Sequence, residues 1–352
     1  IQGSGEGGAN LIDGSSFGPG GTLGLPGRPV PGGDFFGYTD PDGDGWRTSS
    51  DFAFKDNGET EATGLSGRVE WDVAERVQLV SITDWKKYEK VLFIDVDAGP
   101  MNQLANAGAV DADSLSQELR LSGSTGRTHW VAGGYYLNID NNADNALKAP
   151  VNSLIYTLFG NTPFDIGVKA RLKTKSYSAF GQLEFDFTDR LRGRVEARYA
   201  EEEKTQSTPV RDGRVIVNPR AFNDTWSFFT PRFTVDFRAT DALMIYASAA
   251  KGIKAGGFNE NASVAAEESF DPEENWTWEL GTKGSLADGR VNFDVALFYV
   301  DWTDMQLPAL SPGASIPQTV TLNVGSAKSQ GVELALRAAL GMGFTANAGF
   351  SY

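Results

Sequence analysis

The chain of 352 residues has 46 Asp and Glu residues against 31 Lys and Arg residues, so its formal net charge is −15 at pH 7. It has no cysteine and one histidine, which excludes a disulfide framework, a thiolate metal site, a cysteine nucleophile and any metal centre that needs several histidines. The acidic balance argues against nucleic acid as a partner. A hydrophobic content of 40% is enough for a folded protein.

Residues 1–60 are rich in Gly, Pro and Asp and show no periodic pattern, so they are predicted to form a long loop region. Four carboxylates within residues 40–51 have the spacing of an EF-hand calcium loop. No helical pattern flanks them, and the alternative is an acidic, solvated turn. No cofactor is required, and a structural Ca²⁺ is the one candidate ion, with the ligands Asp40, Asp42, Asp44 and Asp51.

From residue 61 onward the dominant pattern has a period of two. Charged and apolar residues alternate strictly in residues 68–73, 182–187 and 232–238. Such alternation indicates β-strands with one apolar and one polar face. No long segment has helical spacing, and the longest apolar runs are too short for a membrane-spanning helix.

The connections between these strands alternate in length. Short turns recur roughly every 50 residues, and each pair of short turns is separated by one long polar connection. Residues 61–352 are therefore predicted to form about twelve antiparallel strands in hairpins. The predicted long connections are residues 98–113, 143–170, 207–225, 259–272 and 308–318.

This sorting of turns by length favours an all-β, antiparallel, up-and-down transmembrane β-barrel with short periplasmic turns and long extracellular loops. Residues 1–60 would then be a long extracellular loop region. Aromatic residues in the strand segments fit interfacial girdles, although aromatic residues are also common in soluble strands. A soluble β array or propeller and a closed twelve-stranded barrel are the alternatives.

Several segments resemble those of the TonB-dependent outer-membrane receptors. Residues 251–259 resemble the family's "KGYKSGGFN" segment, residues 270–283 its "F.PE…YELG.K" segment, and residues 323–333 its "N.G.A..GVE" segment. We interpret the matching residues as structural. They are Lys251, Gly252, Gly256, Gly257, Phe258, Asn259, Glu279, Gly281, Lys283, Gly331 and Glu333.

The resemblance implies that the chain is only the barrel portion, an incomplete part of a larger, plugged barrel. It also implies a place in the outer membrane of a Gram-negative bacterium, in contact with lipid and lipopolysaccharide. The implied function is uptake of a bulky scarce nutrient, with a ferric siderophore first and cobalamin, haem or a glycan as alternatives. TonB would act through a plug region absent from this chain.

No enzyme motif is present, so the chain is not expected to be an enzyme. The alternatives to energised uptake are a passive porin-like channel without a plug and a structural or adhesive surface barrel. Because aromatic rings can stack on a ligand, the loop aromatics are the predicted ligand contacts. They are Phe35, Phe36, Tyr38, Trp46, Tyr156, Phe159, Phe164 and Phe222. A second acidic segment, residues 259–274, would attract divalent cations.

Overall fold

The structure is a computed structural model that describes residues 58–95, 104–149, 153–158, 160–161, 164–211, 214–260, 262, 264–311 and 319–352. The predicted loop region 1–60 lies almost entirely outside these residues, and its assignment stays a prediction. The first described strand begins at Gly58.

The described chain is built around one antiparallel sheet of twelve strands, and the order of the strands in this sheet follows their order along the chain. This is the all-β, up-and-down arrangement expected from the sequence. The strands in order are β1 (Gly58–Ala74), β2 (Val77–Asp95), β3 (Ala105–Thr125), β4 (Thr128–Ala149), β5 (Phe164–Asp186), β6 (Leu191–Arg211), β7 (Arg214–Thr240), β8 (Leu243–Lys254), β11 (Glu273–Leu286), β12 (Val291–Thr303), β15 (Ser326–Gly341) and β16 (Phe344–Ser351).

Two small sheets and two short helices complete the described residues. The small sheets pair β9 (Gly257–Phe258) with β10 (Ser269–Phe270), and β13 (Gln306–Leu310) with β14 (Thr319–Asn323). The helices are α1 (Leu154–Leu158) and the 3₁₀ helix η2 (Ala265–Glu267). Among the described residues, no helix has the length and apolar character needed to span a bilayer.

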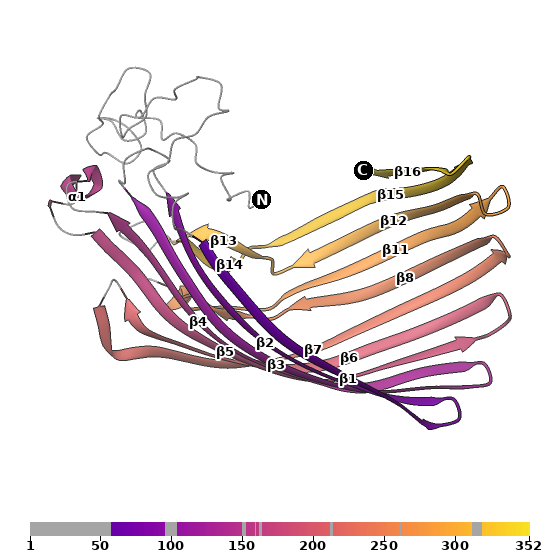
Figure 1. Cartoon of the computed structure of the whole chain (residues 1–352), viewed down its shortest axis with the longest axis horizontal. Helices are drawn as coiled ribbons and strands as arrows, with labels where there is room; N and C mark the ends of the chain where they lie inside the picture. Colours follow the sequence, from indigo (N-terminus) through magenta and orange to yellow (C-terminus); the bar gives the residue numbers. More distant parts are fainter. Residues whose placement is uncertain are drawn as a thin grey trace, which may run out of the picture.

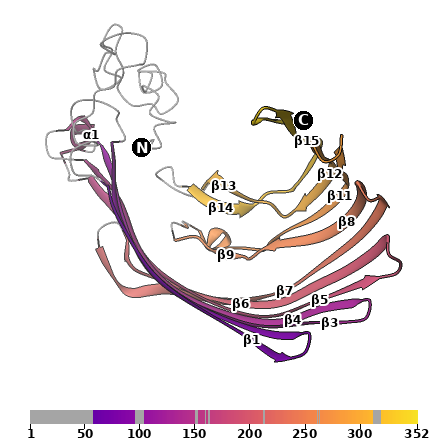
Figure 2. The same cartoon turned by 45° about the vertical axis from the view of Figure 1, so that its right-hand side comes forward.

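The large sheet curves into an open trough. In Figures 1 and 2 the short turns lie together at one end and the long connections at the other, with β9 and the β13–β14 hairpin on the concave side. The edge strands β1 and β16 do not pair with each other in the sheet order, so the twelve strands form part of a barrel wall.

Three predicted long connections are shorter than expected because the strands run into them. β3 begins at Ala105, β4 continues to Ala149, and β6 and β7 are separated only by residues 212–213. Strand pairing uses backbone hydrogen bonds, so polar side chains do not end a strand that projects beyond the apolar band. Cross-strand ion pairs such as Lys169–Asp144, at 2.9 Å, are found in these extensions.

The convex face carries rows of apolar side chains. One row runs across β5, β6 and β7 through Leu183, Val195 and Phe233, which are paired in register. These side chains are 54%, 50% and 48% exposed. Toward the long-connection end the same face becomes charged. In β5, for example, Lys175 lies next to Tyr177 on this face and nearer to that end. An apolar band with an aromatic border and a charged rim is the pattern of a lipid-facing barrel wall.

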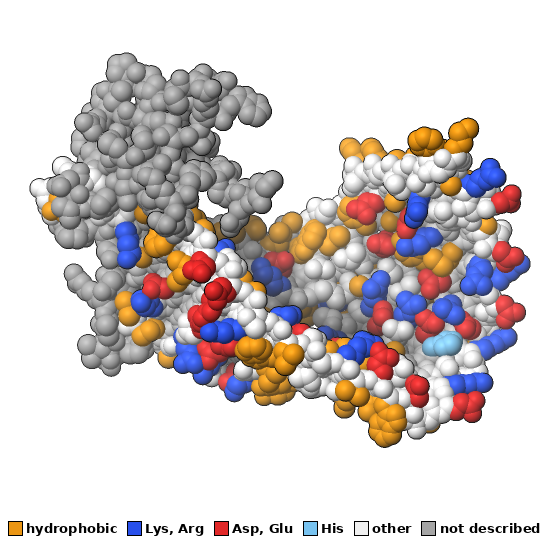
Figure 3. All heavy atoms as spheres, viewed as in Figure 1, with side chains coloured by type: hydrophobic (Ala, Val, Ile, Leu, Met, Phe, Trp, Pro, Cys, Tyr) orange, Lys and Arg blue, Asp and Glu red, His pale blue; other side chains and the backbone are white. Residues whose placement is uncertain are grey.

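The concave face is polar. Neighbouring residues of a strand point to opposite faces of the sheet, so the polar residues that alternate with the apolar ones lie on the concave side. Glu184, which is buried, accepts hydrogen bonds from Arg194 at 2.7 and 2.9 Å and forms an ion pair with Arg192 at 3.0 Å. Arg192 also donates to Asp186 at 2.6 Å. Figure 3 shows acidic and basic side chains interspersed over the short-turn half of this face.

A charge on the convex face is expected to destabilise the protein. Leu183→Arg places a cation in the apolar band and should lower the free energy of unfolding by about 2–4 kcal/mol, as measured by urea titration in phospholipid vesicles. The control is Gln182→Arg, one residue away on the concave face, where a change within about 0.5 kcal/mol is expected. Equal losses in the two variants would contradict the assignment of the two faces.

Candidate functional site

A cluster of loops lies on the concave side near the long-connection end of the sheet. It consists of residues 255–272, which link β8 to β11, and residues 304–325, which link β12 to β15. The sequence predicts long polar connections over residues 259–272 and 308–318, but the segments that contain them also hold the small sheets β9–β10 and β13–β14. We call their described residues the inner loop cluster (Figure 2).

Asn259 fastens the two halves of the inner loop cluster together. Its side chain is buried, its Nδ2 donates to the carbonyl oxygens of Glu267 and Thr321, both at 2.8 Å, and its Oδ1 accepts from the Thr321 N–H at 2.8 Å. The Asn259 amide thus pairs with the Thr321 N–H and C=O groups as the backbone of a neighbouring strand would, and it fixes β14 against the loop that follows β9.

Gln306 makes a second attachment, between β13 and the loop on either side of β9–β10. Its backbone N–H donates to Glu273 Oε2 at 2.7 Å. Its side-chain Nε2 donates to the carbonyl oxygens of Ala255, at 2.9 Å, and Asp271, at 3.0 Å. Asn323 adds a third attachment, because it accepts from the Asp271 N–H at 2.7 Å and donates to the Asp271 carbonyl at 2.9 Å.

An aromatic group joins the inner loop cluster to the sheet. Phe258 stacks on Phe222 at 5.5 Å between ring centroids and lies 5.7 Å from the ring of Trp226. Gly256 is needed beside this group, because a Cβ there would lie 2.6 Å from Trp226 Cε2 and 2.6 Å from the Phe270 carbonyl oxygen. Lys204 closes the contact by donating to the Gly256 carbonyl at 2.8 Å.

The acidic segment 259–274 is used mostly in separate contacts with protein groups. Glu267 is buried and accepts from Ser311 Oγ at 2.7 Å, Glu268 pairs with Arg220 at 2.8 Å, and Glu274 pairs with Lys251 at 2.8 Å. Within the described residues no group of three His, Cys, Asp or Glu side chains could hold a metal ion. The expectation that this segment attracts divalent cations receives no support from its geometry.

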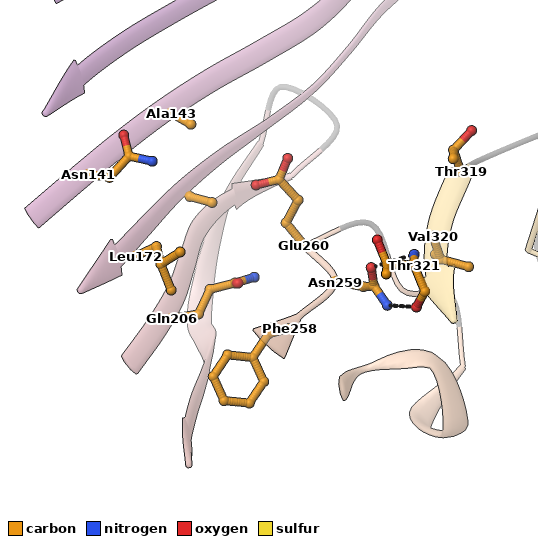
Figure 4. Close-up of a pocket in the computed structure, with 11 residues that line it drawn as sticks. Asn141, Ala143, Leu172, Gln206, Phe258, Asn259, Glu260, Thr319, Val320 and Thr321 are labelled. Carbon is orange, nitrogen blue, oxygen red and sulfur yellow. Dashed lines mark hydrogen bonds between the residues drawn. The ribbon is translucent and has the colours of Figure 1, made fainter. Parts of the chain in front are cut away.

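A cavity of about 300 Å³ separates the inner loop cluster from the sheet. Its wall on the sheet side comes from β4, β5 and β6, and its other side from residues 258–260 and β14 (Figure 4). Glu260 extends from the loop toward the wall, and burial raises the pKa of its carboxyl above the ordinary value. We call this space the wall pocket.

Away from the wall pocket, several residues of the family resemblance meet around Tyr246. The Tyr246 hydroxyl donates to Glu279 at 2.5 Å, and Lys283 lies over its ring at 5.6 Å while pairing with Asp294 at 2.8 Å. A Cβ at position 281 would lie 2.5 Å from the Tyr246 ring, so the glycine at this position leaves space for that ring. Glu279 and Lys283 therefore share the concave face and a common neighbour.

The predicted ligand contacts are only partly within the described residues. Phe35, Phe36, Tyr38, Trp46 and Phe159 lie outside them, as do the calcium candidates Asp40, Asp42, Asp44 and Asp51. Tyr156 is in α1, and Phe164 begins β5, where its side chain is not described. Placing Phe222 in a loop is wrong, because it lies in β7, whose pairing with β6 extends past it. The contact of the predicted aromatic residues with a ligand stays a prediction.

Sequence reasoning missed the residues that shape the wall pocket, Asn141, Gln206 and Glu260. Asn141 and Gln206 are polar residues in polar stretches of strand, and Glu260 is one acid among six in its segment. No local signal distinguishes them, because the pocket arises only when distant hairpins come together. The hydrogen bonds of Gln306 were not predicted from the sequence either.

The Asn259 attachment is testable by hydrogen exchange. Asn259→Leu removes three hydrogen bonds at about 1 kcal/mol each, so residues 319–323 should exchange at least about tenfold faster by mass spectrometry. Asn347→Leu, on the exposed strand β16, is the matched control and should leave exchange in residues 319–323 unchanged. Unchanged exchange in Asn259→Leu would show that the hairpin is held by other contacts.

The close approach at Gly256 gives a second test. Gly256→Ala should cost about 1–3 kcal/mol in the free energy of unfolding, because its Cβ overlaps a backbone carbonyl and a buried indole. Gly67→Ala is the control, since nothing lies within 4 Å of a Cβ there. Urea titrations of both variants should separate them, and similar stabilities would refute the packing argument.

Curated proteins with similar sequences are receptors. The chain is 30% identical over 150 residues to the "Metal-pseudopaline receptor CntO" of Pseudomonas aeruginosa, covering 42% of this chain and 20% of that protein. It is also 30% identical over 131 residues to the "Probable TonB-dependent siderophore receptor PiuA" of Acinetobacter baumannii, covering 36% of this chain and 17% of that protein.

Solved structures share the fold. The siderophore receptor PiuA from Acinetobacter baumannii has a TM-score of 0.67 at 19% identity, over 84% of this chain and 46% of that chain. The ferric yersiniabactin uptake receptor FyuA from Yersinia pestis has a TM-score of 0.65 at 20% identity, over 83% and 42%. The chain thus spans less than half of these solved structures.

The family profile described as "TonB dependent receptor-like, beta-barrel" matches residues 4–352, which is nearly the whole chain. This is a family of receptors and not of enzymes, in agreement with the absence of enzyme motifs in the sequence. The twelve-stranded open sheet, its apolar convex face and the sequence match agree: the chain belongs to the TonB-dependent receptor β-barrel family.

Proposed function

We propose that this chain forms part of the barrel wall of a Gram-negative outer-membrane receptor. The receptor imports a metal bound to a siderophore, with a ferric siderophore as the leading ligand. The observation that carries the proposal is the inner loop cluster, a hydrogen-bonded group of loops folded onto the polar face of a family barrel wall. The names of the curated relatives, a metal-pseudopaline receptor and a probable siderophore receptor, support the same ligand class.

The arrangement suits capture at the long-connection end, which we assign to the cell exterior. Asn259, Gln306 and Asn323 fix the inner loop cluster, so little ordering entropy is lost when a ligand lands on it. Phe222 and Phe258 supply a stacked aromatic surface at its base. The loop aromatics outside the described residues are further proposed ligand contacts.

Passage through the barrel would follow the concave face. Its acidic and basic side chains are paired along the wall, as in Glu184 with Arg192 and Arg194, which offers a polar route without a net field of one sign. Energy would come from TonB acting on a plug region that lies outside this chain. The apolar convex band would contact outer-membrane lipid and lipopolysaccharide.

An uptake assay tests this function. The full-length receptor, expressed in a strain that lacks its own siderophore receptors, should restore accumulation of ⁵⁵Fe supplied as a ferric siderophore. Loss of TonB, or addition of a protonophore, should reduce this accumulation at least about tenfold, because the family's transport step would need energy input. Metal analysis of the same cells shows whether complexes of other metals are imported as well.

The alternatives give different results in the same assay. A passive porin-like channel would admit small solutes equally with and without TonB, and a structural or adhesive barrel would restore no metal accumulation. Uptake that persists at full rate without TonB would refute energised transport.

A further inference from the structure

The wall pocket contains polar atoms that lack partners. Asn141, Leu172 and Gln206 are paired across β4, β5 and β6, so their side chains form one row on the concave face. Two strand spacings place the outer two residues about 10 Å apart. Asn141 Oδ1 and Gln206 Nε2 are both buried with no hydrogen-bond partner, and the Gln206 side chain is only 4% exposed.

Unpartnered buried amide atoms are costly, so a row with one free acceptor and one free donor is a feature that needs an explanation. Space for a ligand is provided by small residues beside the row, since Ala143 and Ala170 also line the pocket. Figure 4 shows the Gln206 amide extending from β6 into the space between the wall and the loop that carries Glu260.

The charge of the wall pocket is set by Glu260. Among the described residues that line the pocket, Glu260 is the one with an ionisable side chain. Two described cations that contact the same loop are engaged elsewhere: Lys204 donates to the Gly256 carbonyl and pairs with Glu202 at 3.1 Å, and Arg220 pairs with Glu268 at 2.8 Å. Glu260 has no cationic partner among the side chains that the structure describes, and a desolvated carboxylate in that situation gains most from a ligand that brings one.

We propose that the wall pocket is a subsite for an ammonium group with an adjacent carbonyl, as in an aminoacyl or aminoamide end of the ligand. The ammonium donates to Glu260 and to Asn141 Oδ1, and the carbonyl oxygen accepts from Gln206 Nε2. A free carboxylate or sulfonate in the same place faces Glu260 and is rejected. The subsite rests on the proposed function, because it assigns part of the imported ligand.

Cysteine labelling tests the charge preference without any metal complex or transport. The chain has no cysteine, so Ala170→Cys in the full-length receptor, with any other cysteine replaced by serine, carries a single thiol at a residue that lines the wall pocket. Its reaction rates with 2-aminoethyl methanethiosulfonate and with 2-sulfonatoethyl methanethiosulfonate are each divided by the rate for free 2-mercaptoethanol. The normalised cationic rate should exceed the anionic rate at least about tenfold.

Two changes identify the source of the preference. Glu260→Gln in the same background should bring the ratio to that of the control Ala200→Cys, which lies on the concave face of β6 outside the wall pocket. Ala143→Cys is the second reporter in case Ala170→Cys fails to fold. A ratio in both pocket variants that equals the Ala200→Cys ratio, or that survives Glu260→Gln, would overturn the proposal.

The amide contact is tested with glycinamide, which carries an ammonium next to a carbonyl. Glycinamide should slow labelling of Ala170→Cys at least about threefold, which corresponds to at least about 0.7 kcal/mol, and acetate should not. Gln206→Leu should abolish this protection, whereas Gln182→Leu, also on the concave face, should preserve it. Equal protection by acetate, or protection that persists in Gln206→Leu, would refute the assignment. Labelling does not depend on TonB, so a failure here is distinguishable from a failure of the uptake assay.

Discussion

Backbone hydrogen bonding inside a bilayer is the constraint on which the rest of this structure depends. A strand in hydrocarbon must satisfy every N–H and C=O group through its neighbours, so the twelve strands stay paired in sequence order over their whole apolar length. Once pairing is fixed, the period of two assigns each side chain to a face. The Leu183–Val195–Phe233 row must be apolar, while the adjacent Gln182–Glu196–Arg232 row is free to be polar.

The polar face then carries the inner loop cluster and the wall pocket. Because its strands continue past the apolar band, β4, β5 and β6 form a rigid wall beside which the inner loop cluster can settle. Three side-chain amides, from Asn259, Gln306 and Asn323, replace the ladder bonds that these irregular loops lack. The loops are thereby held at fixed positions without being strands of the barrel. The wall pocket is the space left between these two rigid parts, and it keeps one acceptor and one donor unused.

Sequence reasoning predicted the fold well and the site poorly, for one physical reason. Alternation and turn length are local signals, and they identified the strands, the hairpin order and both faces. Polarity was a misleading guide to strand ends, because segments such as 207–211 are polar yet paired above the apolar band. Phe222 was placed in a loop for that reason. The contacts of Gln306 with Ala255 and Asp271 join residues 51 and 35 positions apart, and no local pattern encodes such distances.

By itself, the sequence determined that this is an antiparallel barrel wall with one apolar face, and its ordered motifs identified the family. Those properties follow from residue periodicity and spacing, which the chain carries regardless of its path in space. Only the tertiary structure decided that residues 255–272 and 304–325 fold onto the concave face, and that Asn141 and Gln206 lie in one row opposite Glu260. The reason is that burial and missing hydrogen-bond partners are properties of segments brought together by folding.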